Sequence, residues 1–285
     1  MNTPADSPSA PGEDLYTPPA LDMPPRRVVS LVPSLTESLF DLDLGNRLIA
    51  VTDYCTRPPE GVRALPKVGG TKTPDVARII ALQPDLVLMN DEENRLEDAQ
   101  ALQAAGIPIW VTGPRTVQDA LNLLWQMMEV FDHAVMAPRV REIERACDFT
   151  RLAAQANAPA RVFAPIWRDP WMTFNASTYA HDVLVVCGGY NVFAGSADRY
   201  PVVTLDEVVA AQPEIVLLPD EPYPFSEADA AEFTGLDIPA ARHGRIYRLD
   251  GSLLTWHGTR VAYALRDLPG LLMRGGFDEH AHDHP

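Results

Sequence analysis

The sequence has few cysteines and no long apolar run. Its 285 residues include three cysteines, Cys55, Cys147 and Cys187. An odd number at wide spacing gives neither a disulfide framework nor a CxxC metal motif, so we expect free thiols, as in a reducing cytoplasm. No stretch approaches the ~20 apolar residues of a membrane-spanning helix, and we therefore expect no membrane insertion.

Basic residues are also scarce. The 23 lysines and arginines are outnumbered by 39 aspartates and glutamates, which gives a formal net charge of -16. A surface that binds nucleic acid or an anionic membrane needs basic patches. The charge therefore argues against a nucleic-acid partner and is compatible with an acidic binding protein or enzyme.

Motifs for catalysis or metal binding are missing as well. There is no Gly-x-Ser-x-Gly elbow, and Gly69-Gly70-Thr71-Lys72 falls short of a phosphate-binding loop. No histidine lies at a predicted strand end in the first half of the chain, so we do not expect a metal held by histidines from both halves. We expect neither catalysis nor an intrinsic cofactor. The seven histidines are His133, His181, His243, His257, His280, His282 and His284.

What the sequence does contain is a repeat. Residues 78–92 read RIIALQPDLVLMNDE and residues 207–221 read EVVAAQPEIVLLPDE, with seven of fifteen positions identical. In each copy a proline ends a helix, because the residue before a proline is disfavoured in the helical region. A continuous apolar run follows, which is typical of a strand buried on both faces of a parallel sheet.

An acidic pair closes each copy, Asp91-Glu92 and Asp220-Glu221. Ligands of open α/β sheets bind beyond the carboxyl ends of the strands. The repeat therefore predicts an α/β protein with two similar Rossmann-like lobes, each of which presents Asp-Glu at its ligand-facing rim. We expect the N-terminal lobe at 26–132 and the C-terminal lobe at 158–273. A single long helix within 133–157 should join them, with a length of roughly 28 Å.

Local signals predict where several helices begin. Ser34 and Glu37 form the pattern of a capping box. Thr73-Pro74 would place a proline at the first position of the first repeat helix. Ser226 is expected to cap a short helix after the second copy.

The two ends of the chain differ in composition from the rest. Residues 1–25 are rich in Pro, Ser, Ala and Asp, which predicts disorder. They contain no basic segment followed by an apolar core, so they do not form a signal peptide as they stand, which favours the cytoplasm. Residues 274–285 carry three of the histidines and are also expected to be disordered, with at most incidental metal binding.

Aromatic and acidic residues recur at the predicted strand ends. Trp167 and Trp171 flank Arg168 in one loop, which suits a large, flat, partly apolar ligand. Alternatively, such aromatic rings pack beneath their own loops. The pair Glu92-Glu93 either binds polar groups of a ligand or caps the next helix. His257 is either an axial ligand to a cofactor metal or a hydrogen-bonded surface histidine.

Five segments carry a family pattern: residues 27–37 (RVVSLVPSLTE), 51–55 (VTDYC), 82–87 (LQPDLV), 111–112 (VT) and 188–193 (GGYNVF). Together they resemble the helical-backbone substrate-binding proteins of ABC importers, and most of all their cobalamin-binding branch. The resemblance covers about residues 26–272. It implies two α/β lobes joined by one long helix, with the ligand cleft between the lobes. It also implies an extracytoplasmic location and an ABC permease as a possible partner. We expect a monomer.

Members of this family bind vitamin B12, ferric siderophores or haem. We expect cobalamin or a related corrinoid as the ligand. A ferric-siderophore or haem binder is the first alternative, for which Arg115, Arg168 and Arg260 are available. A cytoplasmic corrinoid-handling chaperone or enzyme on the same scaffold is the second. The candidate ligand-binding residues are Ser34, Tyr54, Gly70, Glu92, Glu93, Trp167, Arg168, Trp171, Tyr190, Tyr223, Trp256, His257 and Arg260.

The resemblance also points to a docking site. Such proteins carry one glutamate per lobe, near the start of the repeat helix, which contacts arginines of the permease. Ala77 and Asp206 occupy these positions here. Asp206 is therefore the expected docking residue, and the first lobe lacks its counterpart.

Overall fold

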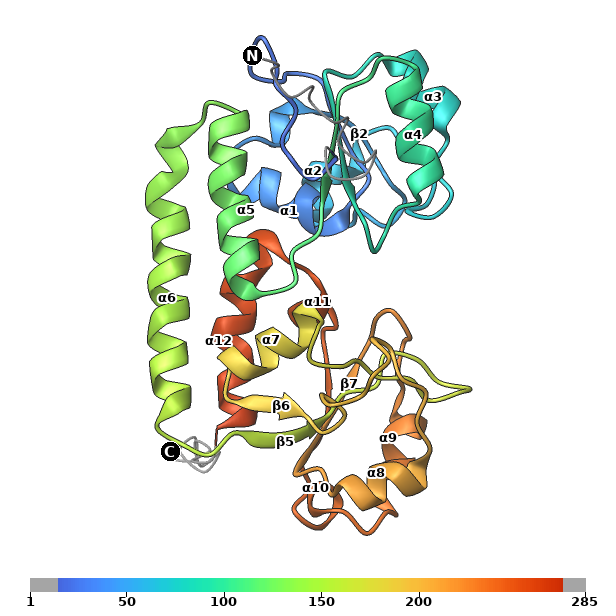
Figure 1. Cartoon of the computed structure of the whole chain (residues 1–285), viewed down its shortest axis with the longest axis vertical. Coiled ribbons are helices and arrows are strands. Elements are labelled where there is room, and N and C mark those ends of the chain that lie inside the picture. The colour runs from blue at the N-terminus through green and yellow to red at the C-terminus, as the bar shows by residue number, and fades with distance from the viewer. Residues whose placement is uncertain (1–14, 274–285) are drawn as a thin grey trace, which may run out of the picture. The chain divides into compact units, whose positions relative to one another are not determined.

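The computed structural model describes residues 15–273, which form two compact α/β units (Figure 1). The first unit, the N-lobe, contains the described residues up to Gly113 together with Leu123–Ala137. The second unit, the C-lobe, contains Pro114–Asn122 and the described residues from Pro138 on. The tail expected at 274–285 lies outside the described residues, as do residues 1–14. The two lobes that the repeat predicts are present.

The N-lobe is built on a parallel four-stranded sheet with the strand order β2-β1-β3-β4. Its strand β3 is buried along its whole length, as predicted for a strand covered on both faces. The elements in chain order are β1 (Val28–Ser30), α1 (Pro33–Asp41), β2 (Leu48–Val51), α2 (Pro59–Arg63), α3 (Val76–Leu82), β3 (Leu86–Asn90), α4 (Leu96–Ala104) and β4 (Ile109–Thr112). The next helix, α5 (Val117–Val130), belongs to the C-lobe up to Asn122 and to the N-lobe from Leu123.

The C-lobe repeats this topology. Its four strands are also parallel, and their order β6-β5-β7-β8 is that of the N-lobe with each strand number raised by four. The second copy of the repeat forms α8 and the buried strand β7. The elements are α6 (Ala137–Gln155), β5 (Ala160–Phe163), α7 (Tyr179–Val186), β6 (Gly189–Asn191), α8 (Leu205–Ala211), β7 (Ile215–Pro219), α9 (Glu227–Thr234), α10 (Pro239–Arg242), β8 (Ile246–Leu249), α11 (Ser252–Thr255) and α12 (Val261–Leu272).

Helix α6, light green in Figure 1, is the expected long helix. It has 19 residues and links the N-lobe to β5 along the chain. Phe149 and Leu152 on this helix are largely exposed. None of the helices within residues 15–273 has the length and apolar character needed to cross a membrane.

The two copies of the repeat share an unusual helix end. Gln83 after α3 and Gln212 after α8 both adopt left-handed backbone angles, with φ of 46° and 48°. Each is followed by a proline, as predicted. A left-handed conformation costs an L-residue roughly 1–2 kcal/mol. Because both lobes accept it at the same position, the turn from helix to buried strand requires it.

Two predicted helix starts are wrong. The helix α1 begins at Pro33, and its N-cap Val32 makes no side-chain cap, so Ser34 and Glu37 do not form a capping box. Proline suits the first helical position because its φ is fixed and it has no N–H to satisfy, which moves the start ahead of Ser34. Similarly, α3 begins at Val76 rather than at a proline. Asp75 caps it by accepting the Arg78 backbone N–H at 2.9 Å.

The structure also differs from the prediction of disorder across residues 1–25, because residues 15–25 have defined positions. Leu15 is only 6% exposed and packs in the N-lobe core with β-strand residues such as Val87, Met89 and Val111. Composition averages over the segment and therefore misses one apolar side chain that finds a place in a core.

We predict that Leu15→Ala destabilises the protein by about 2–4 kcal/mol, because it empties a packed core position. The measurement is the free energy of unfolding from urea denaturation. Met23→Ala is the matched control, since the Met23 side chain in the same segment is 64% exposed. Equal effects of the two substitutions would contradict a core role for Leu15.

Candidate functional site

Two asparagines fix the loop that follows β3. The Asn90 side-chain oxygen accepts the backbone N–H groups of Glu92 at 2.9 Å and Glu93 at 3.2 Å. Asn94 accepts the Asn90 N–H at 2.8 Å and donates to the carbonyl oxygens of Leu31 and Thr71. The loop is therefore tied to the segment after β1 and held in one shape. No sequence signal identified Asn94, because its partners lie far away along the chain.

The acidic residues of this loop differ in their surroundings. Asp91 accepts the Tyr16 hydroxyl at 3.0 Å. The Glu92 carbonyl oxygen accepts a hydrogen bond from Lys72 Nζ at 2.7 Å. Asn90 and Asn94 hold the loop, and the helix α4 begins only at Leu96. The N-cap residue of this helix is Arg95 and neither Glu92 nor Glu93, which were the alternatives for a cap.

Tyr54 stands out at the end of β2. Its side chain is 63% exposed, while its neighbour Cys55 is buried against Thr36 and Thr52. Burial raises the pKa of the Cys55 thiol, which fits a structural role. A Cβ at Gly70 would lie 3.3 Å from the Tyr54 ring, so Gly70 lets the ring pack against the backbone.

Ser34 does not join this group. Its side chain is buried within α1 and presents no surface to a ligand. The N-lobe thus brings Tyr54 and Gly70 together and fixes Glu92 and Glu93 on their own loop.

Aromatic rings form the centre of the candidate site in the C-lobe. Trp167 and Tyr223 meet edge to face, with ring centroids 5.6 Å apart. Trp167 is 45% exposed. Trp171 instead packs inward, stacked on Phe225 at 5.7 Å and edge-on to Phe233 at 5.2 Å. Of the two predicted tryptophans, Trp167 is accessible, whereas Trp171 is partly buried and packs against the core of the C-lobe.

Arg168 lies between these tryptophans, but acidic residues of α9 occupy its guanidinium. It forms ion pairs with Asp229 and Glu232, and its guanidinium carbon lies 5.3 Å from the Trp171 ring centroid. Burial would raise the pKa of Asp229, but hydrogen bonds from Ser226 and Arg168 outweigh it, and the pKa is lowered. Arg168 therefore anchors its loop to α9. Ser226 caps α9, as predicted.

A second cluster follows β7 and β8. Glu221 accepts the Thr255 hydroxyl at 3.0 Å. The Arg260 guanidinium lies over the Trp256 ring at 5.5 Å and reaches Asp250 at 4.0 Å. Trp256, His257 and Arg260 are buried rather than exposed. Of the two alternatives for His257, that of a surface histidine is therefore wrong.

Tyr190 is placed apart from both clusters. It lies inside β6 and pairs with Arg161, near the amino end of the neighbouring strand β5. It is therefore not at the carboxyl ends of the strands. Glu221 closes the second copy of the repeat at such a carboxyl end, but it was not among the candidate ligand-binding residues.

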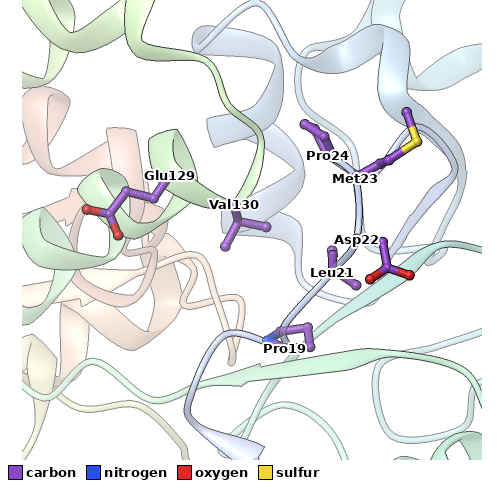
Figure 2. A pocket seen from close by; sticks show the side chains of 7 residues that line it. All are labelled: Pro19, Leu21, Asp22, Met23, Pro24, Glu129 and Val130. Atoms are coloured by element: carbon purple, nitrogen blue, oxygen red, sulfur yellow. The ribbon is translucent and has the colours of Figure 1, made fainter.

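Cavities in the N-lobe lie beside the candidate residues rather than among them. One of about 310 Å³ lies at the end of β3 and is lined by residues including Asn90, Asp91 and Asn94. Another of about 330 Å³ lies along residues 19–24 and the end of α5 (Figure 2). Neither Tyr54 nor Glu92 lines this second cavity. We therefore define the candidate site by the residues at the strand ends and not by this cavity. Its lining side chains are Pro19, Leu21, Asp22, Met23, Pro24, Glu129 and Val130.

Comparisons with known proteins agree on the family. The family described as "Periplasmic binding protein" matches residues 28–253. A vitamin B12-binding protein of Vibrio parahaemolyticus is 30% identical over 250 residues, covering 85% of this chain and 87% of the relative. One of Photorhabdus laumondii is 32% identical over 196 residues, covering 68% and 70%.

Solved structures show the same fold. A periplasmic vitamin B12-binding protein of Vibrio cholerae has a TM-score of 0.76 at 23% identity, covering 87% of this chain and 97% of that one. A periplasmic haem-binding protein of Roseiflexus has a TM-score of 0.70 at 24% identity, covering 86% and 97%. At these sequence identities the structural similarity shows a shared fold and does not identify the ligand.

His257 makes stability depend on pH. Burial lowers its pKa from 6.5 to about 4. The unfolded chain therefore takes up a proton on this histidine at a higher pH than the folded protein does. Stability should fall by about 3 kcal/mol from this residue as the pH drops from about 6.5 to about 4. His181, whose pKa burial also lowers, acts in the same direction.

We predict that His257→Gln flattens this dependence, measured as the free energy of unfolding at intervals from pH 7 to pH 4. His243→Gln, at an exposed position, should follow the wild type. A His257→Gln variant that loses stability as steeply as the wild type would show that His257 is not the titrating group.

Proposed function

Because the chain belongs to the periplasmic binding protein family, the non-enzymatic substrate-binding proteins of ABC-type uptake systems, we propose that it binds cobalamin or a related corrinoid. The ligand would contact residues at the carboxyl ends of the parallel strands, chiefly Trp167 and Tyr223 in the C-lobe. The family assignment removes the enzyme alternative.

The observation that carries this proposal is that Arg168 and Arg260 contact acidic and aromatic residues of their own lobe. Arg168 is paired with two acidic residues of its own lobe, and Arg260 is buried over Trp256 near Asp250. The strand ends themselves carry carboxylates, such as Glu92 and Glu221, and aromatic rings, such as Trp167. A corrinoid is a large, flat ring whose edge carries amide groups, and amide N–H groups can donate to carboxylates. An anionic ligand would instead meet like charges there.

Support for the ligand class also comes from the relatives. Two proteins named for vitamin B12 binding are about 30% identical to this chain. Trp167 offers a rigid aromatic surface of the kind that anchors flat ligands.

One observation favours haem as a second candidate. Tyr54 is exposed at the end of β2, and a tyrosine phenolate can ligate haem iron. Solved haem-binding proteins share the fold. Ferric siderophores have less support, since Arg168 already has acidic partners within its own lobe.

Calorimetric titration with cyanocobalamin, adenosylcobalamin, haem and a ferric hydroxamate tests the proposal. We expect a corrinoid to bind with a dissociation constant below ~10 μM, equivalent to roughly -7 kcal/mol. Haem binding that is lost in Tyr54→Phe, with no corrinoid binding, would support the second candidate in its place.

Two tryptophan variants refine this test. Trp167→Ala should weaken corrinoid binding by more than ~1 kcal/mol with little loss of stability, as for an accessible aromatic anchor. Trp171→Ala should destabilise the fold by ~3 kcal/mol or more, because its ring packs on Phe225 and Phe233. Unchanged affinity in Trp167→Ala would remove Trp167 from the site.

We further propose that Asp206 contacts a permease. It lies exposed in the first turn of α8, and the exposed Ala77 takes the corresponding place in α3. A charged group at the rim of an interface acts mainly on the association rate. We therefore predict that Asp206→Asn slows association with permease-containing vesicles and that Ala77→Glu speeds it. An unchanged rate in both variants would exclude this contact.

A further inference from the structure

Glu221 connects the ends of two strands in the C-lobe. It follows β7 directly, and its Oε1 accepts the Thr255 hydroxyl at 3.0 Å. Its carboxylate also accepts a hydrogen bond from the side chain of Trp256, whose donor is the indole N–H. Both donors lie at the end of α11, which follows β8. One carboxylate thus holds the segment after β8 against the end of β7.

The backbone is shaped for this contact. A Cβ at Gly251 would lie 2.6 Å from both Cγ and the carbonyl oxygen of Glu221, so only glycine fits. The Gly251 N–H donates to Asp220 at 2.7 Å, which brings the two segments together a second time. The close approach of Gly251 to Glu221 thus places the Glu221 side chain beside α11.

Glu221 also stands between the two aromatic clusters of the C-lobe. Tyr223, two residues further along, meets the accessible ring of Trp167. Trp256, which Glu221 contacts, lies under the Arg260 guanidinium. A shift of Glu221 would therefore disturb both clusters.

The stability of the fold does not explain why residue 221 is a glutamate rather than a glutamine. Burial raises the pKa of Glu221, and the nearby carboxylates of Asp220 and Asp250 act in the same direction, against the hydrogen bonds from Thr255 and Trp256. At pH values above the usual pKa of glutamate, the ionised carboxylate of Glu221 therefore lowers the stability of the folded protein relative to the unfolded chain. Glutamine could accept both hydrogen bonds without burying a charge.

We propose that Glu221 is a positioning residue for ligand binding: its charge-assisted hydrogen bonds hold Thr255 and Trp256, and with them the strand ends of the C-lobe, in the conformation that binds the ligand. The ligand part of this inference rests on the proposed function. The contact with Trp256 rests on the structure. The other charged groups near Glu221 are Asp220, Asp250 and Arg260. Burial lowers the pKa of the nearby His257 to about 4, so this histidine is neutral at pH 7.

Titration with cyanocobalamin tests the ligand part. At pH 7, Glu221→Ala should bind about fivefold or more weakly than the wild type, since charged hydrogen bonds are lost. Wild-type affinity should fall as the pH drops and Glu221 takes up a proton. Glu221→Gln should bind a few-fold more weakly than the wild type at pH 7 and show no such fall. Glu227→Gln, at an exposed position in the same lobe, should match the wild type.

A ligand-free measurement separates this inference from the proposed function. Tryptophan fluorescence of the wild type should change with pH as Glu221 titrates, and the change should be absent in Glu221→Gln and Trp256→Phe. Its persistence in Glu221→Gln would overturn the positioning role, as would wild-type affinity in Glu221→Ala. If no corrinoid binds the wild type while the fluorescence change depends on Glu221, the proposed function fails and the contact with Trp256 stands.

Discussion

A strand buried on both faces can present functional groups only at its ends, and each lobe of this protein depends on that constraint. β3 and β7 are enclosed along their whole length. All polar chemistry must therefore lie in the loops that follow the strands. The loop after β3 is held by side-chain amides, whereas the loop after β7 is held by carboxylates. The two lobes therefore fix equivalent loops with different chemical groups.

The sequence predicted the parts of the fold that rest on local physics. A proline after a glutamine ends α3 and α8, and an uninterrupted apolar run makes each central strand. The equal strand orders of the two sheets then follow from the duplication. Helix starts were predicted less well, because several residues compete for a cap. Pro33 displaced Ser34 at α1, and Asp75 displaced Pro74 at α3.

The candidate site was predicted only in part, because its details depend on contacts between residues distant in the chain. Trp167 and Trp171 look equivalent in the sequence, yet the ring of Trp171 packs on Phe225 and Phe233 against the core. Arg168 looks available for an anionic ligand until α9 supplies two acidic partners. No local pattern distinguishes an exposed ring from a packed one or a free cation from a neutralised one.

The acidic character of the strand ends is costly, and the cost is informative. Buried or crowded carboxylates reduce stability unless a partner compensates for them. A sequence optimised for stability alone would carry an amide at a partly buried position such as that of Glu221. Where local stability and the observed residue disagree, a functional constraint is the usual reason. Glu221 shows this disagreement most clearly, since it keeps a charge where glutamine would preserve both hydrogen bonds. A role in holding the ligand-binding conformation of the strand ends explains this carboxylate, whereas the stability of the fold does not.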